Sequence, residues 1–399
     1  MTAMAPSTRA QAAQSVAANL PEKDPGMSKV QVAKPYFPAE DIAEIMTTVR
    51  SVLESGMIMQ GPHVRRFEEE FAAYVGVRFA RAVNSGTSAL HGLLSYFDVR
   101  DREVLVPVNT FLASANAVLF AGGRPVFVDI DPNTLLVDFA DLTRRVTPRT
   151  AGVVLVHVAG LISADVDRIR TFCAERGLFL VEDAAHAAGS SRRGRRAGAL
   201  GEAAAFSLLA TKIITSGGEG GLVTTNDEAL AQRITSLRFH GEDSKRGVQD
   251  RIGYSWRMTE IQAVIGATQV RRLDEIVACR MAIAATYDAA FRALPRVQPL
   301  HTPAGDCNAY YKYPLKLAPS LDRRAVQQRL DAEFGVRSGT SYYPPCHLQP
   351  AYREAFGYRE GDYPVAEAVL AQTIALPMHC DLTEEEVRRV IYGVVAVCG

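Results

Sequence analysis

The stretch Leu178-Phe179-Leu180-Val181-Glu182-Asp183-Ala184-Ala185-His186 contains an apolar, β-rich run that ends in two carboxylates. Six further β-rich runs alternate with helical patterns, and several are apolar without alternation, as in strands covered on both faces. We therefore predict an α/β fold in which helices wrap a mainly parallel, seven-stranded sheet, with functional residues at the carboxyl ends of the strands. The predicted strands are residues 79–83, 103–106, 125–128, 153–158, 178–181, 203–207 and 222–225.

The chain changes character after about residue 273, where helical segments surround a β-rich stretch near residues 310–317. This pattern predicts a smaller C-terminal α/β domain. We expect the apolar stripe of the first helix to pack on this small domain. The predicted parts are a disordered tail at residues 1–26, a large domain at 27–273 and a small domain at 274–399.

The composition excludes several classes of function. Lys and Arg number 44 and Asp and Glu also number 44, so no net charge attracts nucleic acid or anionic lipid. The basic cluster at residues 192–196 has no interleaved aromatics and is interpreted as a solvated hairpin rather than a nucleic-acid site. The longest apolar run, residues 152–162, is much shorter than the roughly 20 residues that cross a bilayer. The six cysteines form no C-x-x-C pair, so we expect a reduced, cytoplasmic protein.

Four strand ends carry residues suited to chemistry. Residues 84–88 (NSGTS) combine helix-start amides with hydroxyl groups, which suits a phosphate or an ordinary helix cap. Asp183 ends a buried strand, where a carboxylate needs a cation or donor, or caps the next helix. Lys212, one of only seven lysines, follows a strand, although most lysines lie on the surface. Phe111 offers an aromatic face after another strand, or belongs to the core.

A phosphate cradle, an aromatic platform, a buried carboxylate and a lysine are the parts that hold pyridoxal 5'-phosphate (PLP). The amine can form a Schiff base with the aldehyde of the cofactor. The carboxylate can keep the pyridine nitrogen protonated, so that the ring accepts electrons. The joint occurrence of these parts on separate strands predicts a PLP-dependent enzyme. We assign no metal ligand.

Eight motifs, taken together, are highly specific. They are residues 56–61 (GMIMQG), 67–71 (FEEEF), 84–90 (NSGTSAL), 181–186 (VEDAAH), 211–212 (TK), 218–221 (GEGG), 256–260 (WRMTE) and 376–378 (LPM). By these motifs the chain resembles the fold-type I sugar aminotransferases of the DegT/DnrJ/StrS family over about residues 32–395. The resemblance implies the PLP-transferase fold of type I.

Carried over residue by residue, the resemblance implies that Lys212 holds the cofactor covalently and then shuttles the proton. It implies that Asp183 pairs with the pyridine nitrogen. Gly86, Thr87 and Ser207 would hold the phosphate.

Other implied roles concern the ring and the partner subunit. Phe111 would stack on the ring, and His186, where the family often has Gln, would lie near the ring hydroxyl. Ser255 stands where the family usually has an Asn that reaches the phosphate across a dimer interface. The resemblance therefore implies a homodimer with shared active sites, while the contact made by the shorter Ser255 stays open.

Three further residues are candidates for contact with the substrate. His157 ends a strand, and Tyr343 and His347 lie in a segment that resembles one near the sugar pocket of the family. Structural roles are equally plausible for both histidines.

The resemblance implies transfer of an amino group from an amino acid, L-glutamate, to a keto carbon of a nucleotide-activated deoxysugar. A keto-cyclitol aminotransferase is the nearest alternative, because such enzymes share these motifs. A PLP-dependent sugar dehydratase on the same fold typically carries His at the position of Lys212, so the lysine argues against it. A sensor protein that keeps PLP without turnover is disfavoured by the intact Lys212 and Asp183.

Overall fold

The computed structural model describes residues 28–243 and 246–399, so the predicted tail at residues 1–26 lies outside the described residues. Its largest element is a seven-stranded sheet in the order β1-β9-β8-β5-β4-β2-β3. The strands are β1 (Phe79–Val83), β2 (Glu103–Pro107), β3 (Arg124–Val128), β4 (Thr150–Val156), β5 (Phe179–Asp183), β8 (Ala203–Ser207) and β9 (Gly221–Thr225). Strands β3, β2, β4, β5 and β8 are parallel, whereas β9 pairs antiparallel with both β8 and β1. The predicted α/β fold with a mainly parallel sheet is confirmed.

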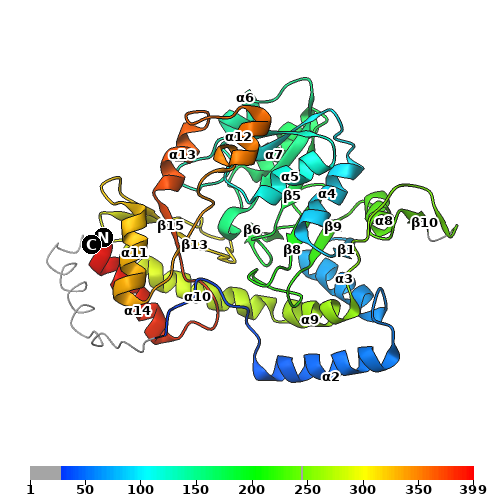
Figure 1. Cartoon of the computed structure of the whole chain (residues 1–399), viewed down its shortest axis with the longest axis horizontal. Coiled ribbons are helices and arrows are strands. Elements are labelled where there is room, and N and C mark those ends of the chain that lie inside the picture. Colours follow the sequence, from blue (N-terminus) through cyan, green and yellow to red (C-terminus); the bar gives the residue numbers. More distant parts are fainter. Residues whose placement is uncertain (1–27, 244–245) are drawn as a thin grey trace.

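Helices cover both faces of this sheet (Figure 1). One face packs on α3 (Pro62–Val75), α7 (Val166–Glu175) and α9 (Glu260–Arg271). The opposite face packs on α4 (Gly86–Tyr96), α5 (Leu112–Phe120), α8 (Glu228–Leu237) and α13 (Pro364–Ala371). Burial on both faces explains why the central strands are apolar without alternation.

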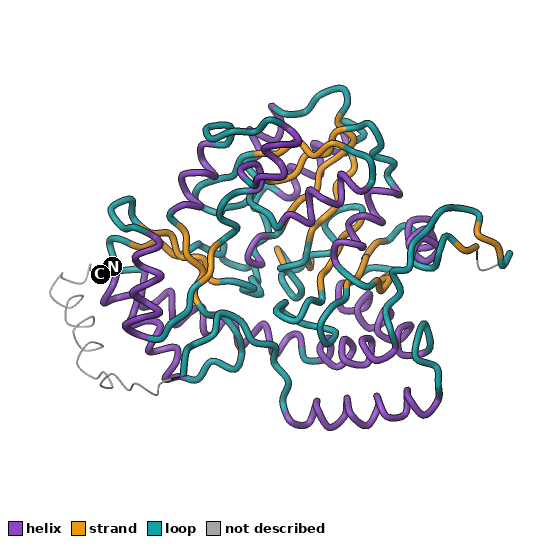
Figure 2. Tube along the Cα trace, viewed as in Figure 1, coloured by secondary structure: helices purple, strands orange, loops and turns teal. Residues whose placement is uncertain are grey.

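A second, antiparallel sheet has the order β12-β13-β15-β14, and Figure 2 shows its strands as a group apart from the large sheet. Its strands are β12 (Val297–Pro299), β13 (Tyr313–Leu317), β14 (Gly339–Thr340) and β15 (Thr373–Leu376). It shares a core with α10 (Leu273–Phe291), α11 (Arg323–Phe334) and α14 (Glu384–Cys398). The first turns of α10 pack into the core of the large sheet and its last turns into this second core. A domain boundary at residue 273 therefore stays a prediction, since one helix joins the two cores.

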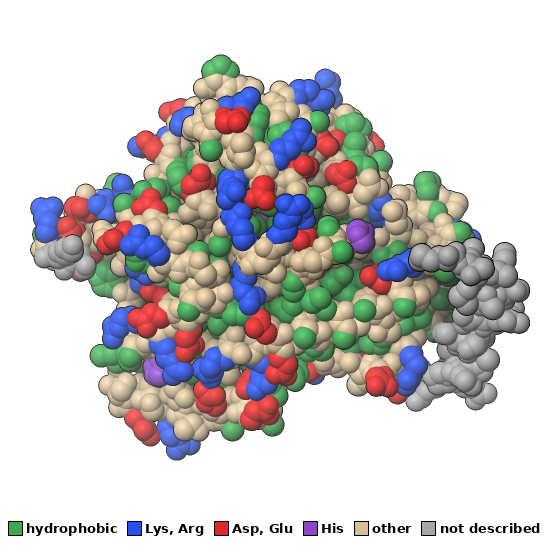
Figure 3. All heavy atoms as spheres, turned by 180° about the vertical axis from the view of Figure 1, so that it is seen from behind, with side chains coloured by type: hydrophobic (Ala, Val, Ile, Leu, Met, Phe, Trp, Pro, Cys, Tyr) green, Lys and Arg blue, Asp and Glu red, His purple; other side chains and the backbone are tan. Residues whose placement is uncertain are grey.

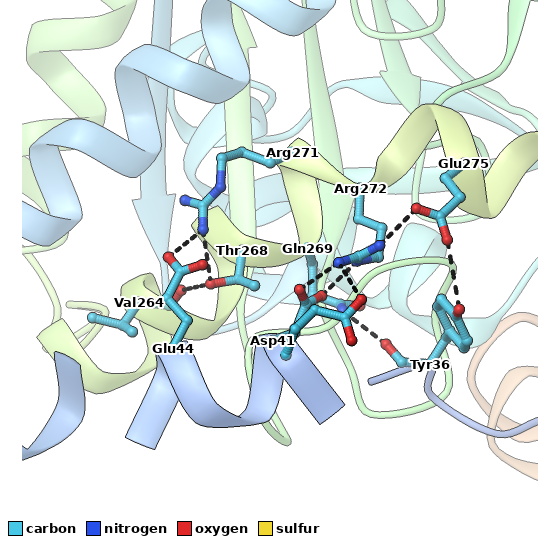
Figure 4. A network of polar contacts seen from close by, with 10 residues as sticks. Tyr36, Asp41, Glu44, Val264, Thr268, Gln269, Arg271, Arg272 and Glu275 are labelled. Atoms are coloured by element: carbon cyan, nitrogen blue, oxygen red, sulfur yellow. Dashed lines mark hydrogen bonds and ion pairs between the residues drawn. The ribbon is translucent and has the colours of Figure 1, made fainter. Parts of the chain in front are cut away.

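The first described helix, α2 (Ala39–Ser55), lies against α9 and not against the small sheet, which corrects our expectation (Figures 1 and 4). The physical reason is a set of ion pairs along α9: Arg272 donates to Asp41 at 2.6 Å, and Arg271 pairs with Glu44. The extended segment before α2 does reach the small sheet, where the amide of Met378 donates to the carbonyl of Val32 at 3.0 Å.

The remaining elements are short. They are α6 (Phe139–Arg144), α12 (Pro350–Phe356), the 3₁₀ turns η1 (Val158–Gly160) and η2 (Cys346–Leu348), and the strand pairs β6 (Ser191–Arg192) with β7 (Arg195–Arg196) and β10 (Glu242–Asp243) with β11 (Val248–Gln249). The pairing of β6 with β7 makes the basic cluster a hairpin, as predicted. The hairpin is not solvated throughout, because Arg192 is buried and pairs with Asp306. None of the helices in the described ranges combines the length and apolar character that a membrane crossing requires.

Candidate active site

Asp183 is the last residue of β5, and its buried side chain points to the face of the sheet that α5 covers. Its Oδ2 accepts the hydroxyl proton of Ser114, on α5, with an O···O distance of 2.5 Å. Its Oδ1 accepts the amide of Ala185 at 3.1 Å. An ionised carboxylate offers about four acceptor positions, so Asp183 keeps capacity for a further donor. Ser114 is a residue that the sequence reasoning missed, because its role depends on how α5 docks on β5.

Lys212 lies in the loop after β8, and its side chain is buried. Its Nζ sits 4.6 Å from the ring centroid of Tyr311. Burial lowers the pKa of Lys212 to about 8, with Asp183 raising it and Lys312 lowering it. A larger share of this amine is therefore neutral near pH 7 than of an ordinary lysine, and only the neutral amine acts as nucleophile or base.

A stack of three rings stands beside the lysine. The ring centroid of His186 lies 4.0 Å from the ring centroid of Tyr311 and 5.6 Å from that of Tyr342. His186 Nδ1 accepts the amide of Ala159 at 3.3 Å, and Nε2 lies 2.7 Å from the hydroxyl of Tyr342. Burial, with the charges of Lys212 and Lys312, holds the pKa of His186 well below its usual value. Since Nδ1 accepts in a neutral ring, Nε2 carries the proton and donates it to Tyr342.

Tyr311 and Tyr342 were not among the predicted site residues. Tyr311 lies within the predicted β-rich stretch at residues 310–317, and Tyr342 comes immediately before the predicted Tyr343. The only available signal was their aromatic character, which does not separate a site residue from a core residue. Their placement depends on the small sheet, whose approach to the large one no local pattern encodes.

The predicted phosphate cradle forms at the start of α4. Ser85 caps the helix by accepting the amide of Ser88 at 3.1 Å. The amides of Gly86 and Thr87 take part in no hydrogen bond within the described ranges, as is usual for a first helical turn. Ser207 ends β8 so close by that a Cβ added at Gly86 would lie 2.9 Å from the Cβ of Ser207. The structure therefore brings Gly86, Thr87 and Ser207 together.

Phe111 directly precedes α5 and is 58% exposed, although it is a large apolar side chain. Its ring centroid lies 6.1 Å from that of Tyr342. An exposed ring beside the His186 stack has a face free for a flat ligand, whereas a core phenylalanine would be covered.

The side chains of the three predicted substrate residues have other partners within the described ranges, so their contact with a substrate stays a prediction. His157 is fully buried, and its Nε2 lies 2.8 Å from Glu182, on the face of β5 opposite to Asp183. His347 is fully buried as well and lies 2.8 Å from Glu367. Tyr343 packs under the guanidinium of Arg323, 4.5 Å from the ring centroid. The backbone amide of His157 donates to the carbonyl of Asp183 at 3.1 Å. In the described ranges, none of the three side chains forms a hydrogen bond or an ion pair with the side chain of Lys212 or Asp183.

Ser255 lies on an exposed segment beside the start of α4. Its hydroxyl accepts a hydrogen bond from Arg257 Nη2 at 2.9 Å. The neighbouring carbonyl of Trp256 accepts the amide of Asn84 at 2.8 Å, which anchors this segment to the first turn of the cradle. The contact of Ser255 with a partner subunit stays a prediction.

The arrangement fits PLP on observations of this chain alone. Two unused amides and the Ser207 hydroxyl suit a phosphate group. A buried carboxylate with unused acceptor capacity suits a protonated ring nitrogen, and a buried amine of lowered pKa suits an aldehyde. The exposed face of Phe111 suits a flat ring.

Comparisons with known proteins agree on one family. The sequence profile of the DegT/DnrJ/EryC1/StrS aminotransferase family matches residues 39–395. GDP-perosamine synthase of Caulobacter vibrioides is 36% identical over 370 residues, which cover 92% of this chain and 97% of that protein. The dTDP-4-dehydro-2,3,6-trideoxy-D-glucose 4-aminotransferase of Saccharopolyspora spinosa is 36% identical, covering 87% of this chain and 92% of that one. The PLP form of the sugar aminotransferase Spr1654 from Streptococcus pneumoniae superimposes with a TM-score of 0.85 and 28% identity, covering 92% of this chain and 98% of that chain.

Proposed function

Because the chain belongs to the DegT/DnrJ/EryC1/StrS aminotransferase family, we propose that it transfers an amino group from L-glutamate to a keto carbon of a nucleotide-activated deoxysugar. The predicted PLP-dependent aminotransferase of fold type I is confirmed by the family and by the solved relative in its PLP form. The nucleotide sugar is supported by two relatives whose names specify GDP-linked and dTDP-linked sugars. The single observation that carries the proposal is the buried Lys212 amine in the same site as Asp183.

The roles of the residues follow from their positions. Gly86, Thr87 and Ser207 bind the phosphate, because their amides and hydroxyl lie together at the helix start. When bound, PLP supplies an electron sink for the carbon that loses its proton. Asp183 maintains that property by holding the ring nitrogen protonated, and Ser114 fixes the carboxylate in place.

Lys212 moves the proton. Its amine has the lowered pKa that a general base needs near neutral pH, and the ring of Tyr311 shields it from water. His186 and Tyr342 orient the other edge of the cofactor, since their hydrogen bond fixes both side chains. Phe111 covers one face of the ring.

A homodimer is part of the proposal, and an uncovered apolar surface supports it. On α2 the side chains of Ile42, Met46 and Leu53 are exposed, Met46 to 63%. Met57, Ile58 and Met59 in the following loop are exposed as well. The sequence puts all the apolar residues of α2 on one stripe, yet in one chain only part of that stripe is covered. Figure 3 shows further hydrophobic side chains gathered across the rear face. A second copy of the chain would bury such surface, and a catalytically competent monomer in sedimentation at assay concentration would contradict it.

A cytoplasmic location is also proposed, and the six free cysteines support it because thiols persist in a reducing compartment. The location can be checked by fractionating cells that express a tagged chain. The tagged chain is expected in the soluble cytoplasmic fraction.

The test of the function is an isotope transfer. The enzyme is incubated with ¹⁵N-labelled L-glutamate and, in separate reactions, with 4-keto-6-deoxyhexoses linked to GDP or dTDP or with a keto-cyclitol. The mass of each product is then measured by mass spectrometry. We expect one ¹⁵N atom in the sugar and an equal amount of 2-oxoglutarate. Label in a keto-cyclitol alone, or a deoxygenated sugar without nitrogen, would replace the proposal by one of its alternatives.

A further inference from the structure

Lys312 is a second lysine of the site region to which the proposed chemistry gives no role. It directly precedes β13, where Tyr313 turns into the core of the small sheet. Its Nζ donates to the carbonyl of Thr340 at 3.0 Å. The same nitrogen lies 4.3 Å from the ring centroid of Tyr342 and 5.9 Å from that of Tyr311. Two aromatic rings therefore hold this ammonium group.

The rings connect Lys312 to the reacting amine. The Nζ of Lys212 lies 4.6 Å from the ring centroid of Tyr311. Both lysines therefore contact the same ring. Tyr342, the other ring under Lys312, is hydrogen-bonded to His186. Lys312 thus borders the volume in which Lys212 and His186 meet the cofactor.

The charge of Lys312 has no acidic partner in the described ranges, whereas two more exposed lysines do have one. Lys29 pairs with Asp331 at 2.8 Å, and Lys34 pairs with Asp381 at 2.6 Å. An ammonium group has three donors, and Lys312 uses one of them on a neutral carbonyl. A partly buried cation without a counter-ion is costly, and an arriving anion would remove that cost. Burial accordingly lowers the pKa of Lys312 to about 8.

We propose that Lys312 binds an anionic group of the substrate, and that this group is the carboxylate next to the amine of the amino-acid donor. This inference rests on the proposed function. A carboxylate has two oxygens that can take the remaining donors of Lys312. In an amino acid the carboxylate is bonded to the carbon that carries the transferred nitrogen, so it must lie close to Lys212. The diphosphate of a nucleotide sugar is also anionic, but the sugar ring separates it from the keto carbon.

The test compares the holoenzyme with Lys312→Met, Lys312→Gln and Lys312→Arg variants. Lys316→Met is the matched control, because Lys316 lies in β13, four residues after Lys312, and donates to the carbonyl of Pro132, away from the rings. The first readout is competitive binding of glutarate, a dicarboxylate that cannot transfer nitrogen. The second readout is the concentration dependence of the half-reaction with L-glutamate. The third is equilibrium binding of GDP and dTDP.

We expect Lys312→Met and Lys312→Gln to weaken glutarate and glutamate binding by roughly ten- to a hundredfold, the loss of one charge-assisted bond. Lys312→Arg should retain most of the affinity, and Lys316→Met all of it. The affinity for GDP and dTDP should change less than about twofold in every variant, because these nucleotides do not contact Lys312 in the proposed complex. Circular dichroism and PLP content check that each variant is folded. If Lys312→Met does not fold, the comparison is made with Lys312→Gln.

Three results would overturn the inference. They are no binding of glutarate to the wild-type enzyme, unchanged glutarate and glutamate binding in the folded Lys312→Met or Lys312→Gln variant, and weakened GDP or dTDP binding with glutarate unaffected. The last result would assign Lys312 to the diphosphate. Failure of the proposed function looks different, because the wild-type enzyme would then transfer no nitrogen from glutamate to any nucleotide sugar.

Discussion

Glu182 and Asp183 are consecutive carboxylates on β5, yet the structure treats them in opposite ways. Glu182 is completely buried, and all of its acceptor positions are used. Its donors are the amides of Gly198, Leu200 and Gly201 and the ring of His157. Asp183 faces the other side of the sheet, where Ser114 and one amide are the only donors to its carboxylate within residues 28–243 and 246–399. A saturated carboxylate stabilises the fold, whereas an unsaturated one can bind a ligand.

The largest expected effect separates the chemistry from the scaffold. Lys212→Ala should lose turnover by several orders of magnitude, because the covalent partner of the cofactor and the general base are removed together. PLP should still bind through its phosphate and ring. Steady-state rates and equilibrium dialysis measure the two effects, with Lys316→Ala as control. A variant with an unaffected rate would refute the assignment of Lys212.

Removing the charge of Asp183 should mainly lower activity, whereas removing the charge of Glu182 should mainly lower stability. Asp183→Asn should lower kcat by about 10²- to 10³-fold, the usual cost of one preorganised electrostatic contact, with little loss of stability. Glu182→Gln should lower the free energy of unfolding by about 3–5 kcal/mol, because the new amide opposes backbone donors. Denaturant unfolding and steady-state kinetics on both variants measure the changes in stability and in kcat. If the two variants showed the same pattern, the contrast between the faces of β5 would be wrong.

Acid stability should report the same contrast. Burial raises the pKa of Glu182, but the hydrogen bonds from His157, Gly198 and Gly201 outweigh it, so the pKa is lowered overall. The folded state therefore gains stability from this group above its unfolded pKa of 4.5 and loses it as the pH falls further. The free energy of unfolding, measured from pH 6 to pH 3, should fall less steeply for Glu182→Gln than for the wild type. Equal slopes would mean that Glu182 is not a source of acid sensitivity.

A smaller effect concerns the amine itself. Lys212 is faced by the carboxylate of Asp183, the ammonium of Lys312 and the ring of Tyr311, and burial lowers its pKa to about 8. The rate at which PLP attaches to the apo-protein should therefore rise through pH 8, as the amine loses its proton. Removal of the like charge in Lys312→Met should move this rise to higher pH. A rise centred near pH 10 in the wild type would contradict the account.

The smallest effect is expected at Ser255. If a longer side chain restores a hydrogen bond to the phosphate of the partner subunit's cofactor, Ser255→Asn should lower the Kd for PLP, by up to roughly tenfold per 1.4 kcal/mol gained. The rate at saturating PLP should hardly change. Arg257 already bonds the Ser255 hydroxyl, so weaker binding in the variant would mean that the arginine has taken over this contact. A titration of both apo-proteins with PLP distinguishes the two outcomes.

The large sheet could be predicted from the sequence because its strands are short, apolar and bounded by glycines or polar residues. The position of antiparallel β9 between β1 and β8 could not, since pairing partners are set by the tertiary fold. The structure brings together Gly86, Thr87 and Ser207 because Ser207 ends one predicted strand and the other two begin the helix that soon follows another. His157 was a candidate for the same reason, but residues along a strand alternate between faces, and a strand end read from sequence does not show which face a side chain takes.

Apart from Ser114 on α5, the parts of the site that the sequence did not indicate lie on segments next to the small sheet. Tyr311, Lys312 and Tyr342 reach the site only because that sheet packs beside the carboxyl ends of the large one. No local pattern distinguishes Lys312 from an ordinary surface lysine, and its rarity was the one available signal.

Covalent trapping identifies the lysine that forms the Schiff base with the cofactor. The holoenzyme is reduced with borohydride, digested, and its peptides are mapped by mass spectrometry for a pyridoxyl phosphate group. We expect the modification at Lys212 and none at Lys312, although both amines have a pKa lowered to about 8 and both contact Tyr311. Modification of Lys312 or of any other lysine, with Lys212 unmodified, would contradict it.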